Sequence, residues 1–179
     1  TLNPWENRRI NLRERFGLKP ERYVQEIGEE LPKTEVLIPL YLAAEEQLET
    51  LARDRRQEPS PRWQANYDLL YAQTVCYKVR VYEYAAYLAA FAQNPKAVTK
   101  STTTYWRVEH RPRTITDEAT EAAAKATELF EAVIRDHPGT PYAKRAQWEL
   151  ARGYGIELVE DEWDPRHETL GPQIKKPNL

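Results

Sequence analysis

The segment SPRWQANYDLLYAQTVCYKVRVYEYAAYLAAFAQNP, residues 60–95, decides the fold. Ser60 can cap a helix and Pro61 suits its first position, whereas Pro95 cannot continue it. Between them, large side chains recur every three or four residues, which is the spacing of one helix face. This spacing predicts one long helix with a buried stripe made of Trp63, Tyr67, Leu70, Thr74, Tyr77, Val81, Tyr84, Leu88 and Phe91.

A second stripe lies on a neighbouring face of the same helix. A helix with two apolar faces is expected to pack against partners on two sides, so we expect this one to be the central element of a bundle. The second stripe consists of Tyr71, Val75, Tyr82, Ala85 and Ala89.

The preceding residues are expected to form the other arm of a long antiparallel helical hairpin over residues 33–95. The connector QEPSP is short and contains proline, which suits an antiparallel pair. Pro39 interrupts the pattern, so the helix either begins near Leu40 or is kinked at Pro39. The apolar spacing is carried by Leu37, Tyr41, Ala44, Leu48 and Leu51.

Residues 1–32 are expected to form short helices that pack on this bundle. The stretch NPWENRRINLRERFG, residues 3–17, begins with a capping residue at Asn3 and ends at Gly17, a common helix stop. The stretch KPERYVQEIGEELP, residues 19–32, predicts a second short helix.

The helical pattern is lost over residues 96–115. The stretch STTTYWRVEHRP is rich in β-branched and aromatic residues, which predicts an irregular or β-like insertion near residues 97–113. A short strand here would pair with IELVED, which starts at residue 156. The last residues lack a core pattern, so we expect an extended tail over residues 156–179.

Residues 116–155 predict a second helical hairpin. His137-Pro138-Gly139 ends its first helix, and Thr140-Pro141 caps and starts its second. Small residues on both helices allow close approach of their axes. The buried positions are expected to be Ala119, Ala122, Ala126, Leu129, Phe130 and Val133 on the first helix, and Ala143, Ala146, Leu150 and Tyr154 on the second.

The stretch ATELFEAVIRDHPGTPYAKRAQWELARGYG resembles the junction of tetratricopeptide-like repeats, particularly those of bacterial envelope scaffolds. The resemblance covers residues 119–155. It implies an all-α fold, a helical pair that stacks on neighbouring helices, binding of a protein partner, and a place in the cell envelope or periplasm. The matching positions are Phe130, Pro138, Ala143, Ala146, Leu150 and Tyr154.

A wider resemblance covers most of the chain. NPWENRRINLRERFG, EPSPRWQANYDL and the second hairpin, in that order, resemble the region that follows the von Willebrand factor type A domain in large uncharacterised bacterial proteins. The Asp-x-Ser-x-Ser metal motif of that domain is absent, so its metal-dependent adhesion does not carry over. The chain opens with Thr1 and has no methionine, which favours a cleaved leader or a part of a longer protein.

The composition excludes several kinds of site. The single cysteine, Cys76, excludes an internal disulfide framework, and 6 glycines in the whole chain leave no glycine-rich phosphate loop. The stretch EDEWDPRHE, residues 160–168, lacks the ligand alternation of a calcium loop and is interpreted as a solvated acidic turn. No run approaches the ~20 apolar residues that cross a bilayer. We therefore expect no metal and no cofactor.

We do not expect an enzyme. Neither serine lies in a nucleophile elbow, and Ser60 is better explained as a helix cap. His137 adjoins a helix end, where an imidazole suits the carbonyl dipoles. No catalytic constellation is visible among Ser60, Ser101, His110, His137 and His167.

The remaining hypothesis is binding. We expect a protein-interaction or scaffold module of a larger bacterial protein, in which Tyr82, Tyr87 and Trp106 wall a groove for a partner segment. Residues 63–115 hold seven basic and three acidic residues, whereas residues from 116 onward hold eight basic and thirteen acidic ones. The alternative is therefore binding of nucleic acid or another anionic polymer by the loop 100–113, through Tyr105, Trp106, Arg107, Arg111 and Arg113.

Overall fold

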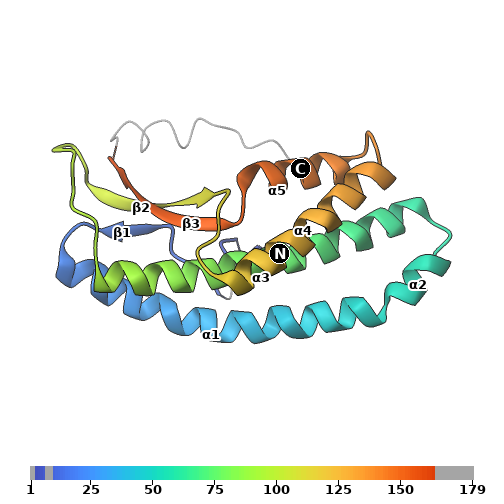
Figure 1. Cartoon of the computed structure of the whole chain (residues 1–179), viewed down its shortest axis with the longest axis horizontal. Helices are drawn as coiled ribbons and strands as arrows, with labels where there is room; N and C mark the ends of the chain where they lie inside the picture. The colour runs from blue at the N-terminus through green and yellow to red at the C-terminus, as the bar shows by residue number, and fades with distance from the viewer. Residues whose placement is uncertain (1–2, 7–9, 164–179) are drawn as a thin grey trace.

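The computed structural model describes residues 3–6 and 10–163, and its longest helix is the one predicted from residues 60–95. This helix, α3 (Pro61–Gln93), packs against α1 (Pro20–Thr50) on one side and against α4 (Asp117–Asp136) on another (Figure 1). Its predicted position at the centre of the fold is confirmed.

Helix α1 is longer than the sequence pattern predicts. It runs without a break through Pro32 and Pro39, so residues 19–32 are not a separate helix and no helix starts near Leu40. Both prolines are exposed, and α1 curves around the rest of the molecule (Figure 1). A proline on the convex, solvent-facing side loses its helical hydrogen bond without burying the freed carbonyl, so the helix bends instead of ending. The short helix α2 (Ala52–Gln57) then leads to α3.

The predicted helix over residues 3–17 is wrong. Residues 3–6 form a turn, and Arg15–Gly17 form the strand β1. Two glutamates of α1 explain the extended backbone: Glu26 accepts a hydrogen bond from the Gly17 N–H at 2.7 Å, and Glu30 accepts one from the Arg13 N–H at 2.9 Å. These amides are therefore satisfied by α1 and not by a helix of their own.

The insertion belongs to a three-stranded antiparallel sheet in the order β1-β2-β3, with β2 at Tyr105–Arg111 and β3 at Gly155–Asp161. The predicted pairing with residues 156–161 is confirmed, with Val108 opposite Leu158. The all-α expectation is thus corrected to a mainly helical fold with a small sheet. The expectation of an extended tail from residue 156 is wrong for residues 156–161, which belong to β3. Residues 164–179 lie outside the described part.

Helix α4 and helix α5 (Pro141–Arg152) form the predicted hairpin (Figure 1). Thr116 and Thr140 cap them, since each side-chain oxygen accepts the amide hydrogen bond three residues on at 3.2 Å. Gly139 has a φ of 74°, a conformation that glycine adopts without strain, and it allows the tight reversal between the helices.

Charged side chains of α3 attach it to its neighbours. Arg80 and Glu149 of α5 form an ion pair at 2.6 Å with both side chains fully buried. Lys78 pairs with Glu45 of α1. Glu83, also fully buried, accepts hydrogen bonds from the backbone just before α4. Because a buried charge without its partner is costly, these contacts fix the position of each element on α3.

One half-buried histidine, His110, belongs to strand β2. The Nδ1 atom of His110 has no hydrogen-bond partner within the described residues, and its ring packs edge-on against Trp5 at 5.2 Å. Burial, together with the nearby charges of Arg80 and Arg152, lowers the pKa of His110 from 6.5 to about 2. The imidazole is therefore neutral in the folded protein at every pH above that value.

We expect this histidine to make stability depend on pH. Below pH 6.5 the unfolded chain binds a proton at His110 that the folded protein does not, so stability that is complete above pH 6.5 falls as the pH drops. The loss between pH 7 and pH 5 should be about 2 kcal/mol of unfolding free energy from this residue. Urea unfolding at both pH values should show a smaller loss for His110→Phe than for the wild type. An equal loss in both would contradict this assignment.

Candidate binding groove

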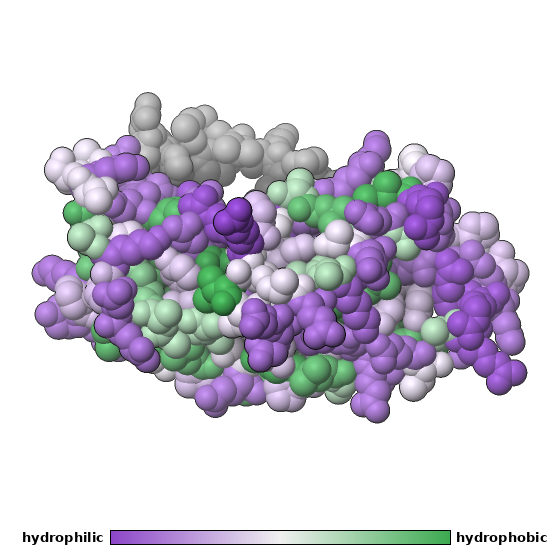
Figure 2. Space-filling view, viewed as in Figure 1, coloured by the Kyte–Doolittle hydropathy of each residue, from purple (hydrophilic) through white to green (hydrophobic). Residues whose placement is uncertain are grey.

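An open groove of about 500 Å³ lies where α3, the two longer strands and the connector between β2 and α4 meet. In Figure 1 this connector crosses in front of α3, and Figure 2 shows hydrophobic surface at the same place. The groove is lined by Tyr87, Arg111, Pro112, Arg113, Ile115, Ile156 and Glu157.

The connector is held in place from both sides. The Ile115 N–H donates to the two carboxylate oxygens of Glu83, at 2.9 and 3.0 Å, which fixes it to α3. On the other side it approaches Gly155 so closely that a Cβ there would lie 1.8 Å from the Arg113 carbonyl oxygen. A glycine is therefore required at the start of β3, and the connector is fixed between α3 and β3.

The groove walls are apolar. The Tyr87 ring stacks on Phe91 with 6.3 Å between centroids, so its orientation is fixed. Ile156 is almost fully buried and forms the floor, whereas Ile115 is 55% exposed at the rim. An exposed isoleucine beside a fixed aromatic ring offers apolar surface to a partner side chain.

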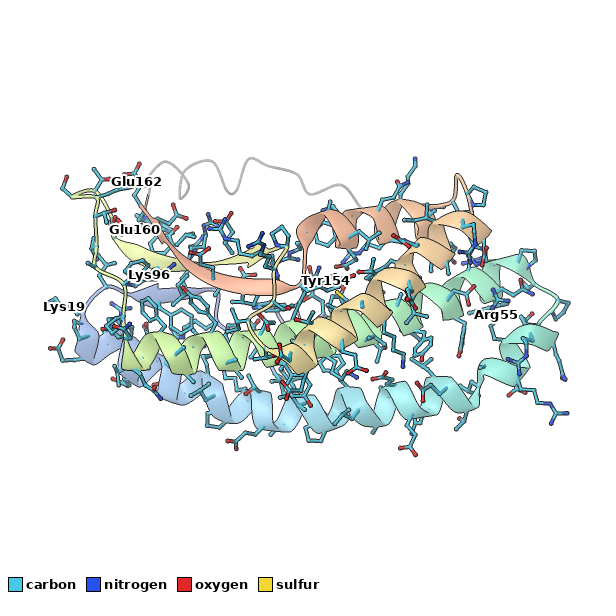
Figure 3. The ribbon with its side chains drawn as sticks, in the orientation of Figure 1. Lys19, Arg55, Lys96, Tyr154, Glu160 and Glu162 are labelled. Carbon is cyan, nitrogen blue, oxygen red and sulfur yellow. The ribbon has the colours of Figure 1, made fainter. Side chains whose placement is uncertain are left out.

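The rim carries an excess of positive charge. Glu157 is shared by Lys96 and Arg111, and its hydrogen bond from Lys96 is the main reason that its pKa is lowered. Arg113 is exposed and has no ion pair or hydrogen bond to any residue that the structure describes. Figure 3 shows Lys96 just beyond the end of α3, below the end of β3 that carries Glu160.

Three of the predicted binding residues, Tyr87, Arg111 and Arg113, meet in this groove. Two of the predicted aromatic walls do not. Tyr82 is 38% exposed on α3 but does not line the groove, and Trp106 is 2% exposed, packed edge-on against Phe91 at 5.3 Å. Trp106 is a core residue because alternate residues of β2 face α3, so its ring is not available for a ligand.

The other two predicted residues lie on the outer face of the sheet. The Nε atom of Arg107 donates to Asp161 at 2.6 Å, and the Tyr105 hydroxyl donates to the same carboxylate at 3.0 Å. The Arg15 guanidinium lies 5.2 Å from the Tyr105 ring centroid. The positive charge of β2 is thus partly neutralised by β3 within the sheet.

Sequence reasoning missed the apolar residues of the groove, Pro112, Ile115 and Ile156. Two signals were available. Ile115 is a large apolar residue between two threonines in the connector, and Ile156 and Leu158 alternate with polar residues in a segment expected to pair with β2. Neither signal predicts that the connector crosses α3, because that contact depends on a hydrogen bond from the connector to the buried carboxylate of Glu83.

No cluster of metal-ligating side chains occurs in residues 3–6 and 10–163. The part of EDEWDPRHE that is described has other contacts: Glu160 accepts hydrogen bonds from the Thr99 and Lys100 amides at 2.8 and 3.0 Å. His167 lies outside the described residues. Cys76 is fully buried, and burial raises the pKa of its thiol to about 12, which leaves it unreactive. His137 contacts Asp68 at 2.7 Å.

Comparisons with protein families, curated proteins and solved structures found no match to this chain.

None of the helices in the described residues is both long enough and apolar enough to span a bilayer.

Proposed function

We propose that this chain is a protein-interaction module that serves as a scaffold within a larger bacterial protein and catalyses no reaction. The observation that carries the proposal is the groove: its walls are apolar, its connector is fixed by Glu83 and Gly155, and its polar side chains are two arginines and a glutamate held in an ion pair. Such a groove binds by shape and charge.

The groove fits an extended segment with one apolar side chain and one carboxylate. The apolar side chain would lie between Tyr87 and Ile115, where it would cover the exposed surface of Ile115. The carboxylate would pair with Arg113, whose guanidinium can donate two parallel hydrogen bonds. Because Lys96 and Arg111 share the single charge of Glu157, an acidic partner would also reduce the excess positive charge of the rim.

The α4–α5 pair supports a scaffold role, and we infer that it is a tetratricopeptide-like unit. Ala126, Ala143 and Ala146 are buried, which permits close approach of the two helices, and Phe130 fills the space beside them. Units of this kind stack on neighbouring helices and present partner-binding surfaces. Its likeness to bacterial envelope scaffolds makes the cell envelope or periplasm our proposal for its location.

Binding of nucleic acid through the loop 100–113 is the less favoured alternative. Single-strand binding needs exposed aromatic rings and unpaired cations. Trp106 is in the core, while Arg107 and Arg111 already pair with acidic residues of β3. If an oligonucleotide bound, its affinity would fall steeply with salt concentration, whereas binding to an apolar groove would change little.

We expect a library of random ten-residue peptides, selected on the purified chain, to be enriched in sequences that combine an aliphatic or aromatic residue with Asp or Glu. The same selection on Arg113→Glu should lose the preference for acidic residues and gain one for Lys or Arg, because the rim charge is reversed. Deep sequencing of both selected pools measures the effect.

The matched control is Arg62→Glu, which makes the same change at an exposed position at the start of α3, away from the groove. Its selected peptides should equal those of the wild type. Identical enrichment in the wild type and Arg113→Glu, or no enrichment in either, would contradict the proposal.

A further inference from the structure

The outer face of α1 carries an exposed apolar surface that no described element covers. We call it the α1 strip and define it as Val36, Pro39, Leu40, Leu42 and Ala43. Val36, Leu40 and Leu42 are 52%, 57% and 47% exposed. Figure 2 shows hydrophobic surface along the lower edge of the molecule, where Figure 1 places α1.

The α1 strip is not part of the hydrophobic core. The residues that attach α1 to the rest of the fold, Leu37, Tyr41 and Leu48, lie on the opposite side of the helix and are buried. The solvent-facing side of a surface helix usually carries polar residues. A group of large apolar side chains on that side therefore indicates a surface that binds a partner.

The charges beside the α1 strip are acidic. Glu35 and Glu46 are exposed, and neither has an ion pair or hydrogen bond among the residues that the structure describes. The nearby Lys33 is already engaged, since its Nζ donates to Glu30 at 2.6 Å and to the Asn11 carbonyl at 2.9 Å. A partner therefore meets apolar surface between two unpaired carboxylates.

The two prolines leave carbonyl oxygens, which carry partial negative charge, without a helical hydrogen bond on the same face. Pro32 and Pro39 have no N–H, so the carbonyl groups of Gly28 and Glu35 receive no helical hydrogen bond from them. Both prolines are exposed, and their seven-residue spacing places the two carbonyls about 10 Å apart along the helix axis. Two cationic side chains seven residues apart on a partner helix would match the spacing of these two carbonyls along the axis.

We propose that the α1 strip binds an amphipathic helix of a partner protein whose apolar face is bordered by Lys or Arg. The apolar face would cover Leu40 and its neighbours, and the cations would face Glu35 and Glu46. A second copy of α1 fits less well, because it would bring these carboxylates against each other. This surface is separate from the groove, so the module would hold two partners of opposite charge.

The test uses two designed 15-residue helical peptides with the same leucine face, one bordered by lysines and the other by glutamates. We expect the lysine peptide to bind the wild-type chain and the glutamate peptide to bind at least tenfold more weakly. The double variant Val36→Ser/Leu40→Ser should weaken binding of the lysine peptide about tenfold, and Glu35→Lys/Glu46→Lys should reverse the preference between peptides. Fluorescence anisotropy of labelled peptides measures the affinities.

Two controls separate this surface from others. Glu118→Lys/Glu131→Lys makes the same charge change at exposed positions of α4 and should leave both affinities unchanged. Arg113→Glu alters the groove and should also retain binding of the lysine peptide. All these positions are exposed, so circular dichroism should show folded variants.

Equal binding of the lysine peptide to the wild type and to Val36→Ser/Leu40→Ser would overturn the proposal. So would a concentration-dependent dimer of the wild type, seen by sedimentation, that the same variant abolishes, because the α1 strip would then be covered by a second copy of this chain.

Discussion

Replacing Glu149 by glutamine is expected to lower the free energy of unfolding by about 3–5 kcal/mol, because it leaves the buried guanidinium of Arg80 without its counter-charge. Arg80 also donates to the Glu149 and Gly153 carbonyls, at 3.1 and 2.9 Å, and cannot turn to solvent. Burial opposes ionisation of Glu149, but Arg80 and the Tyr77 hydroxyl outweigh it, so its pKa is lowered. Urea unfolding at pH 7 measures the loss.

The double variant Arg80→Met/Glu149→Leu serves as the control for this prediction. It removes both charges together, so its free energy of unfolding should lie much closer to that of the wild type than that of Glu149→Gln does. If Glu149→Gln unfolded at nearly the wild-type urea concentration, the ion pair would not be what joins α5 to α3.

Replacing Trp106 by alanine is expected to lower the free energy of unfolding by about 3–5 kcal/mol, the usual cost of removing a buried indole. The ring packs against Phe91, so the loss would loosen the sheet from the end of α3. Chemical unfolding measures the effect. Trp106→Phe should recover part of the stability.

The same residue separates a core role from a ligand role. Trp106→Phe should bind the peptides selected on the wild type with unchanged affinity, because the indole does not line the groove. A variant that folded as stably as the wild type but lost peptide binding would show that Trp106 contacts the ligand and that its place in the core is wrong.

Local sequence signals predict helices α3, α4 and α5. Pro61 begins α3 and Thr140 caps α5 as expected, because a proline or a capping hydroxyl acts within one turn of its own position. The pairing of β2 with β3 was also predicted, since the stretch around Trp106 is rich in the β-branched and aromatic residues that favour strands.

The N-terminal region could not be predicted in the same way. Asn3 and Gly17 are plausible helix ends, but the amides between them include two that bond to Glu26 and Glu30 on α1. That contact is between segments distant in sequence, so no local pattern contains it. The two alternatives at Pro39, a helix start near Leu40 or a kinked helix, could not be separated for a related reason. Whether a proline ends or bends a helix depends on whether its freed carbonyl faces water.

The residues of the binding groove also include some that local sequence predicts and others that depend on contacts between distant segments. Tyr87, Arg111 and Arg113 were chosen from the sequence because aromatic and basic residues suit binding, and they lie together. Their meeting with Ile115 depends on the buried Glu83, which sequence reasoning treated only as one acidic residue among basic ones. A side chain's neighbours across the fold decide whether it binds a partner or holds the structure.

The most direct test of the proposed interaction is a map of backbone amide chemical shifts as a peptide selected on the wild type is added to labelled protein. The proposal predicts the largest changes at Tyr87, at residues 111–115 and at residues 156–157, with little change in α2 or α5. Changes concentrated away from the groove, or spread evenly over the chain, would contradict it.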